Sequence, residues 1–312
     1  MPKPVLVVGS INLDLVASAP KIPFPGETLI GQSFQTFFGG KGANQAVAVA
    51  RLGHPVNIIG KVGDDDIGKR LIQGLKTAGV RTSAVGKAKR TSSGVALIAT
   101  DKSGQNCIIV IPGANGKVGP SDLRKYSSLI ASAGIILTQL ETPIETVNDL
   151  LRMASRHGVP VMLDPAPARE LPNEMLRHVA WLTPNESEAA LLCGEASGTL
   201  SRKAQEYAET LLARGPANMI IKMGEQGAFL ATQDGIREFV PSFKVKAIDS
   251  TAAGDAFNGG FAVALMQGKS PSDAMRFASA VAAISVTRQG AQPSMPSARE
   301  VAGFLRRSPA TV

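Results

Sequence analysis

The chain has 312 residues, of which 44% are hydrophobic and 19% charged, and its formal net charge is +8. This composition excludes a disordered chain and supplies a large core, enough for one α/β domain with a small appendage. The 33 Lys and Arg residues are scattered and aromatic residues make up only 4%, which disfavours a nucleic-acid surface. A basic surface also attracts small anionic ligands.

The sequence gives three indications of cellular setting. Cys107 and Cys193 lie far apart and match no metal-ligand spacing. Asn12 and Asp14 interrupt the first apolar run, which is not typical of a secretory signal. No apolar run reaches the roughly 18 residues that a membrane span needs. We therefore expect a protein of the reducing cytoplasm, without a membrane partner.

Short apolar runs alternate with amphipathic stretches along the chain. Runs with no polar face predict buried strands, and they cover residues 5–10, 56–63, 134–140, 159–167, 179–185 and 218–224. Between them, apolar residues at helical spacing predict helices, as in 43–50 and 150–154. This alternation predicts an α/β fold, an open and mostly parallel sheet with helices on both faces. Ligands of such sheets bind beyond the carboxyl ends of the strands.

Two segments interrupt this alternation with strands that lack helices. Residues 19–38 carry three prolines and then β-prone alternation, and residues 93–113 resemble a hairpin that turns at 101–104. We expect insertions at about 15–38 and 93–113 to form a small separate sheet, a lid over the strand ends of a single domain spanning 1–312. A pair of edge hairpins on the main sheet is the alternative.

Two phosphate-binding motifs are incomplete. GSINLD, residues 9–14, has one glycine where a dinucleotide fingerprint needs three. GDDDIGKR, residues 63–70, has Arg where a P-loop needs Ser or Thr, and its aspartates would repel phosphate. The second stretch instead predicts the start of an amphipathic helix.

A glycine-rich motif precedes the first predicted helix. Gly39, Gly40 and Gly42 allow tight backbone geometry and close approach to a ligand, and the helix is expected to start near Asn44. Lys41 and Asn44 add a cation and an amide where helix N–H groups are free. The motif favours a ligand rich in hydroxyls, and a plain strand-to-helix turn is the alternative.

Asn12 and Asp14 are placed by the sequence at the end of the first strand. They would face the same crevice if that strand is central, and a carboxylate can accept two hydrogen bonds from a vicinal diol. By itself, Asp14 is equally compatible with a sugar ligand and with a turn.

A second motif, DSTAAGDAFNGG, spans residues 249–260 and leads into a long apolar helix. The N–H groups of Ala252, Ala253 and Gly254 would be free donors at the positive helix end, which suits a phosphate. Asp255 follows them directly. It could act as a general base for a hydroxyl that attacks a phosphoryl group there, or it could be an ordinary helix-start aspartate.

Together, GGKGANQAVAVARLG (39–53) and DSTAAGDAFNGG (249–260) resemble the two signatures of the ribokinase-like family of carbohydrate kinases. The resemblance covers essentially the whole chain. Residues 9–14, 164–172, 183–188 and 286–294 are similar to those of family members that act on ribose. The resemblance implies ATP-dependent phosphorylation of the 5-hydroxyl of D-ribose, giving D-ribose 5-phosphate and ADP. It also implies Mg²⁺ with ATP, K⁺ as activator, and a homodimer formed through the lid.

The resemblance assigns site residues by position. Asp255 is the catalytic base. The residues that contact the sugar are Asn12, Asp14, Gly40, Lys41, Asn44, Glu141 and Asp255. The residues at the nucleotide are Asn185, Lys222, Gly224, Glu225, Gln226, Gly227, Ala252, Ala253, Gly254 and Ser279. The residues at the monovalent cation, mostly through backbone carbonyls, are Asp249, Thr251, Ser285, Arg288, Gly290 and Ser294. Glu188 lies near Mg²⁺.

Some of these assignments have simpler alternatives. The segment around Asn185 and Glu188 could be a plain helix cap, and residues 222–227 a plain turn after a strand. The chain also departs from the family pattern. Ala252 stands for a common glycine, Asp164 stands where many members have Asn, and Ser279 where some have His.

Other functions remain open from the sequence. The chain could phosphorylate 2-deoxyribose, a nucleoside or another small sugar. Members acting on deoxyribose tend to carry an apolar residue at the position of Asn12, so the amide favours a substrate that has its 2-hydroxyl. A non-catalytic sugar-binding regulator is the third alternative, and Asp255 and Lys41 argue against it.

Overall fold

The computed structural model describes residues 2–102, 105–196, 198, 200 and 203–307. Its larger sheet has nine strands, which lie in the spatial order β13 (Arg237–Pro241), β12 (Gly227–Thr232), β11 (Asn218–Lys222), β10 (Trp181–Leu182), β9 (Val161–Leu163), β8 (Ile135–Thr138), β1 (Val5–Val8), β4 (Val56–Gly63) and β5 (Val85–Ala88). Strands β11 through β5 pair in parallel, and β12 and β13 add an antiparallel edge.

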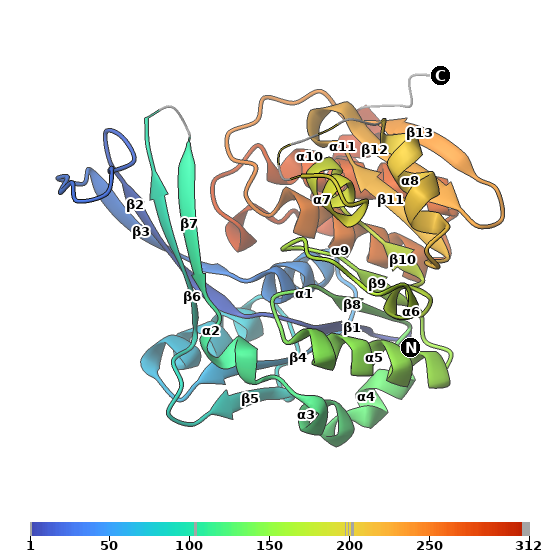
Figure 1. Cartoon of the computed structure of the whole chain (residues 1–312), viewed down its shortest axis with the longest axis horizontal. Coiled ribbons are helices and arrows are strands. Elements are labelled where there is room, and N and C mark those ends of the chain that lie inside the picture. The colour runs from blue at the N-terminus through green and yellow to red at the C-terminus, as the bar shows by residue number, and fades with distance from the viewer. Residues whose placement is uncertain (1, 103–104, 197, 199, 201–202, 308–312) are drawn as a thin grey trace.

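Helices cover both faces of this sheet (Figure 1). One face packs against α1 (Lys41–Arg51), α2 (Asp66–Thr77), α9 (Ala253–Met266), α10 (Pro271–Ser285) and α11 (Ala298–Arg307). The other packs against α3 (Pro120–Lys125), α4 (Ser127–Ser132), α5 (Ile144–Arg156), α6 (Asn173–Leu176), α7 (Glu186–Leu192) and α8 (Ala204–Leu212). Short 3₁₀ turns are η1 (Gly113–Lys117), η2 (Gly224–Gln226) and η3 (Gln292–Ser294). No helix in the described ranges is long and apolar enough to cross a membrane.

The central strand β1 explains why both faces are covered. Val5 and Val7 belong to the core under α1 and α9, whereas Leu6 and Val8 belong to the core under α5. All four side chains are buried because alternate residues of a strand point to opposite faces. The predicted fold class, a mostly parallel α/β sheet with helices on both faces, is confirmed.

A second, four-stranded sheet, called the small sheet below, projects from this body (Figure 1). Its strands lie in the order β3 (Ser33–Gly39), β2 (Asn12–Ser18), β6 (Gly94–Thr100) and β7 (Asn106–Ile111). The two central strands pair in parallel and each outer pair is antiparallel. A separate sheet, rather than two edge hairpins, is therefore correct. Residues 103–104 of the predicted turn lie outside the described residues.

Three details differ from the sequence prediction. Asn12 and Asp14 do not end the first strand, since β1 ends at Val8 and both residues lie on β2. Helix α1 starts at Lys41 and not near Asn44, because Gly40, with φ +86°, already turns the chain into the helix. The antiparallel edge strands β12 and β13 were not predicted from the apolar runs.

Helix α9 lies deep in the core and close to α1. Apart from Asp255 and Asn258, its residues are apolar or small on all sides, as expected for a helix buried all round. A Cβ on Gly259 would lie 2.6 Å from Cβ of Ala48 on α1, and one on Gly260 would lie 2.9 Å from a methyl of Val281 on α10. The two glycines therefore let α9 pack closely against both helices, which sets the distance between the two motif-bearing N-termini.

Candidate active site

The first turns of α1 and α9 meet at Asp255. Its Oδ2 accepts a hydrogen bond from Nδ2 of Asn44 at 3.0 Å, and its Oδ1 accepts one from Nε2 of Gln45 at 3.0 Å. Asn44 and Ala48 share one face of α1, and Asp255 and Gly259 share one face of α9, because residues four apart lie one above the other. The close glycine contact thus brings the two polar side chains together one turn earlier.

Burial dominates the electrostatics of Asp255, whose side chain is 4% exposed. Burial raises its pKa to about 6, the cation of Lys41 lowers that pKa, and the carboxylate of Asp164 raises it again. A carboxylate with a pKa near 6 is largely ionised at neutral pH and still basic enough to accept a proton.

The glycines of the first motif serve close contacts within the protein. A Cβ on Gly40 would lie 2.7 Å from the backbone N of Asn12, and one on Gly39 would lie 2.2 Å from Oδ2 of Asp14. A Cβ on Gly42 would likewise lie 2.7 Å from the backbone C of Gly9. These contacts fix β2 against the start of α1. They bring Asn12 and Asp14 to the same place as Asn44.

Asp14 lies among other acidic groups. Burial raises its pKa to about 7, with further contributions from the charges of Glu141 and Asp255. Glu141 follows β8 and accepts hydrogen bonds from the Ser10 hydroxyl and from the backbone N of Lys41, the latter at 3.2 Å. Three carboxylates therefore gather at this end of the sheet.

Lys41 is the cation that these carboxylates surround. Burial by itself would lower its pKa, but Asp255, Asp164, Glu141 and Glu188 together raise it above the ordinary value. The ammonium group therefore stays protonated at neutral pH and can donate to a polar ligand or to a phosphate.

Asn12 is buried and positioned by a residue that sequence reasoning missed. Its Oδ1 accepts a hydrogen bond from Nδ2 of Asn115 at 2.6 Å, and Oδ1 of Asn115 accepts from the backbone N of Ile11 at 2.9 Å. This fixes the carboxamide so that Oδ1 of Asn12 points to Asn115 and its Nδ2 donors are directed elsewhere. Asn115 lies in η1, next to no recognisable motif, so no local pattern pointed to it.

The N-terminus of α9 has the geometry of an anion site. Ala252 is the N-cap, with the left-handed angles φ 59° and ψ 18°, an uncommon conformation for a residue with a Cβ. The backbone N of Ala253 donates to the carbonyl of Ser250 at 3.2 Å, while the N–H group of Gly254 lies at the positive end of this 14-residue helix. A Cβ on Gly254 would lie 3.3 Å from Nζ of Lys222, so this lysine lies beside the same helix end.

Asn185 and Glu188 form a reciprocal helix cap at the start of α7. Oδ1 of Asn185 accepts from the backbone N of Glu188, and Oε2 of Glu188 accepts from the backbone N of Asn185, each at 2.8 Å. The helix cap that was the simpler alternative for Asn185 and Glu188 is therefore present in the structure. Burial raises the pKa of Glu188, while the nearby charge of Lys222 lowers it, and its Oε1 is not used by the cap.

The remaining nucleotide candidates lie on a turn and a helix. Residues 224–226 form the η2 turn between β11 and β12, with positive φ at Gly224 (+56°) and Gly227 (+132°). Glu225 and Gln226 are exposed on that turn. Ser279 is 7% exposed in the middle of α10. This turn immediately follows Lys222 in the chain, whereas Ser279 comes from a different element.

Two of the candidate residues for a monovalent cation, Thr251 and Gly290, contact the carboxylate of a third, Asp249. Asp249 accepts from the backbone N of Thr251 and from that of Gly290, each at 2.8 Å, so it connects two loops. The side chain of Arg288 pairs with Glu300 at 2.5 Å, which turns its charge toward α11. The hydroxyls of Ser285 and Ser294 donate to the local carbonyls of Ala282 and Ala291. No cluster of three or more His, Cys, Asp or Glu side chains in the described residues could hold a metal.

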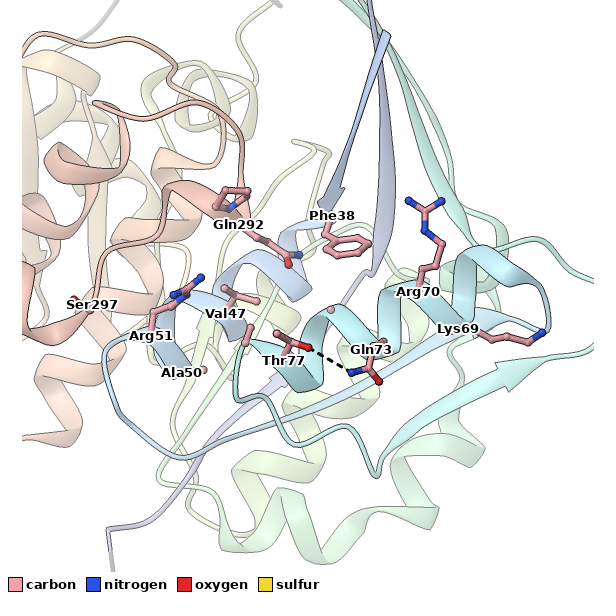
Figure 2. A pocket seen from close by; sticks show the side chains of 13 residues that line it. Phe38, Val47, Ala50, Arg51, Lys69, Arg70, Gln73, Thr77, Gln292 and Ser297 are labelled. Atoms are coloured by element: carbon pink, nitrogen blue, oxygen red, sulfur yellow. Dashed lines mark hydrogen bonds between the residues drawn. The ribbon is translucent and has the colours of Figure 1, made fainter.

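A large groove lies away from this site. It has a volume of about 970 Å³ and lies along α1 and α2, with Phe38 of the small sheet and Gln292 of η3 at its edges (Figure 2). Arg51 and Arg70 extend from opposite ends of it. The groove does not include Asp255 or Lys41, so its size does not mark the reaction centre.

Comparison with known proteins agrees with these two motifs. The model of the pfkB family carbohydrate kinases matches residues 3–298. The chain is 42% identical over 305 residues to a ribokinase of Haemophilus influenzae, covering 98% of this chain and 99% of the relative. It is 38% identical to a deoxyribokinase of Salmonella typhi, covering 96% and 98%. The solved structure of Arabidopsis thaliana ribokinase complexed with ribose and ATP matches with a TM-score of 0.89, 33% identity and coverage of 98% and 99%. The chain therefore belongs to the pfkB family of carbohydrate kinases.

Proposed function

We propose that the chain is an ATP-dependent kinase that phosphorylates the 5-hydroxyl of D-ribose and releases D-ribose 5-phosphate and ADP. One observation carries this proposal: Asp255 is buried at the anion-binding end of α9 and is held by Asn44 of the glycine motif at 3.0 Å. A carboxylate that would act as base, a polar motif that would face the sugar and the N-terminus of a helix therefore lie together. The relatives named above are kinases of ribose and deoxyribose.

Asp255 would act as the general base. It removes the proton from the sugar 5-hydroxyl as that oxygen forms a bond to the γ-phosphorus of ATP, and the bond between this phosphorus and the β,γ-bridging oxygen breaks as ADP leaves. The N–H groups of Ala252 and Gly254 would stabilise the charge on the transferring group, and that of Ala253 would have to leave the carbonyl of Ser250 to join them. Lys41, which its carboxylate neighbours keep protonated, would also neutralise negative charge on the transferring group.

Sugar hydroxyls would be bound by Asn12, Asp14, the backbone at Gly40, and Glu141, which surround the same end of the sheet. The nucleotide would lie along Asn185 and Lys222, the 224–227 turn and Ser279. The small sheet carries Asn12 and Asp14, so we propose that it is a lid within one domain and closes over the sugar.

The donors present fit the two expected ions. Mg²⁺ prefers oxygen ligands and retains water, and the unused Oε1 of Glu188 beside the capping Asn185 suits it. Bound with ATP, this ion would supply charge neutralisation at the β- and γ-phosphates. The Asp249 carboxylate with the carbonyls of Thr251, Ser285, Arg288, Gly290 and Ser294 would be a hard-oxygen set suited to K⁺.

We also propose a homodimer formed through the small sheet. Its edge strand β7 exposes Ile108 (51%), Ile109 (60%) and Val110 (45%), and Leu97 on β6 is 42% exposed. An apolar edge strand of this kind is stabilised when a second chain covers it. A location in the cytoplasm would fit the supply of ATP, and Cys107 and Cys193 are not joined in a disulfide.

An ADP-release assay tests the substrate. Ribose, 2-deoxyribose, fructose, ketodeoxygluconate and nucleosides are compared, with and without K⁺, and ribose is expected to give the highest kcat/KM. Another sugar exceeding ribose tenfold would overturn the substrate assignment. The main alternative is 2-deoxyribose, and the fixed amide of Asn12 favours ribose because such a donor can bind the hydroxyl that deoxyribose lacks.

A further inference from the structure

A line of buried polar side chains extends from Asp255 to Lys222. Nε2 of Gln45 donates to Oδ1 of Asp255 at 3.0 Å and to Oδ2 of Asp164 at 3.1 Å. The other oxygen of Asp164 accepts from Nζ of Lys222 at 3.0 Å. A single amide therefore lies between the carboxylate at the helix end and an ion pair formed by the residue that follows β9 and the last residue of β11.

The orientation of the Gln45 amide is determined by its surroundings. Its Oε1 accepts from Nε2 of Gln139 at 2.7 Å, so its carbonyl and both of its N–H groups are used. Turning the amide over would direct its oxygen at two carboxylates and its N–H₂ group at another N–H₂ group. Gln45 is 1% exposed, so water cannot replace these partners.

Asp255 is held at both oxygens as a result. Asn44 donates to Oδ2 and Gln45 to Oδ1, and both donors come from consecutive residues in the first turn of α1. Two donors on two oxygens fix the plane of the carboxylate, which a single hydrogen bond would leave free to rotate. A base must be held close to its ideal geometry to act on a hydroxyl, and an error of about 1 Å can cost on the order of 10²-fold in rate.

We propose that Gln45 is a positioning residue: it orients Asp255 for proton abstraction and connects this carboxylate to the Asp164–Lys222 ion pair beside the anion-binding helix end. The inference rests on the proposed role of Asp255 as base. Asp164 is central to the connection, because one of its oxygens accepts from Gln45 and the other from Lys222.

Gln45 and Asp164 shift the pKa of Asp255 in opposite directions. The hydrogen bond from Gln45 lowers the pKa of Asp255, whereas the negative charge of Asp164 raises it. The other charged groups facing this carboxylate are Lys41 on α1 and Asp14 on β2. Further from Asp255, Lys222 pairs with Asp164, and the carboxylates of Glu141 and Glu188 face Lys41. Apart from Asp164 itself, the variants below leave these charged groups in place.

The test compares Gln45→Met, which keeps volume and removes the amide, with Asp164→Asn, which keeps shape and removes the charge. For Gln45→Met we expect kcat about 10- to 100-fold lower, the KM for ribose within about threefold, and the acid limb of the kcat–pH profile moved to higher pH. For Asp164→Asn we expect the acid limb to move to lower pH.

Thr138→Val is the matched control, since it removes a buried hydrogen bond, from Oγ1 to the carbonyl of Val8 at 2.9 Å, in the same part of the sheet. It should lower the melting temperature without moving the acid limb. Unchanged kcat and acid limb in Gln45→Met would overturn the proposal. A rate loss in Gln45→Met with an unmoved limb would also overturn it, since that pattern indicates a merely structural role.

The Asp164→Asn variant tests the connection to the ion pair, and an acid limb that stays or moves upward would contradict it. Failure of this inference is distinguishable from failure of the proposed function. If Asp255→Asn is inactive and Gln45→Met is normal, only the positioning role is wrong. Near-normal turnover in Asp255→Asn would instead remove the proposed function itself.

Discussion

Asn44 and Asp255, which are 211 positions apart in the sequence, meet through a 3.0 Å hydrogen bond at the first turns of α1 and α9. Each residue belongs to one of the two sequence motifs. Their contact depends on close helix packing one turn away, where Gly259 lies against Ala48. The site is therefore sensitive both to the polar groups themselves and to the small residues behind them.

Replacing the base removes proton acceptance while the fold remains. For Asp255→Asn we expect kcat to fall by about 10²- to 10⁴-fold with a modest change in ribose affinity. Steady-state kinetics measures the first quantity and calorimetric titration of ribose the second. Turnover close to that of the unchanged protein would exclude Asp255 as base.

Adding a methyl group between the two helices should separate them. In Gly259→Ala the new Cβ would lie 2.6 Å from Ala48, and we expect a loss of about 1–3 kcal/mol in the free energy of unfolding and a lower kcat. Denaturant titration and kinetics measure both. Gly303→Ala in α11 is the matched control: its nearest contact is 3.9 Å away, so it should be neutral or more stable by up to about 1 kcal/mol. Equal behaviour of the two variants would contradict this packing argument.

Asp14 and Asp255 should make stability depend on pH. Their pKa values in the folded protein, about 7 and about 6, lie above the ordinary value of 3.8. The folded state therefore binds more protons than the unfolded state between about pH 4 and 7, so the stabilisation is present at low pH and is lost as the pH rises through 6 to 7.

Asp14→Asn removes one of these two titrations. We expect the melting temperature of this variant, minus that of the unchanged protein, to be higher at pH 8 than at pH 5. Thermal unfolding in matched buffers measures this difference. Asp66→Asn serves as control, since Asp66 is an exposed residue whose pKa lies below its ordinary value. A constant difference across this pH range for Asp14→Asn would contradict the argument.

Asn12 should control discrimination between ribose and 2-deoxyribose. Removing its amide in Asn12→Leu should lower the ratio of their kcat/KM values by about tenfold or more, because a donor to the 2-hydroxyl is lost. Asn115→Leu is the control: it breaks the same 2.6 Å hydrogen bond but leaves the Asn12 amide in place. If both variants change the ratio equally, the effect arises from the position of β2 and not from the amide.

The exposed edge of the small sheet should set the oligomeric state. Ile109→Lys places a charge on the apolar surface of β7 and is expected to convert a dimer to a monomer in sedimentation or light-scattering measurements. Phe239→Lys, on the exposed β13 of the main sheet, is the control and should leave the dimer unchanged. A monomer before any substitution would contradict the proposed dimer.

The sequence by itself determined the sheet class and the two motifs, and it favoured the small sheet over two edge hairpins. These are local properties: apolar runs without a polar face predict buried parallel strands, and residues such as Gly40 and Ala252 mark special turns before helices. The catalytic candidate Asp255 also followed from its place after a small-residue turn and from the family resemblance.

Only the tertiary structure decided which side chains meet and how their charges behave. Gln45 and Asn115 had no local signal, because their roles depend on partners that are more than 90 positions away, such as Gln139 for Gln45 and Asn12 for Asn115. The glycines of the first motif turned out to contact the protein's own strand. The raised pKa of Asp255 likewise depends on burial and on neighbours across space, which no stretch of sequence contains.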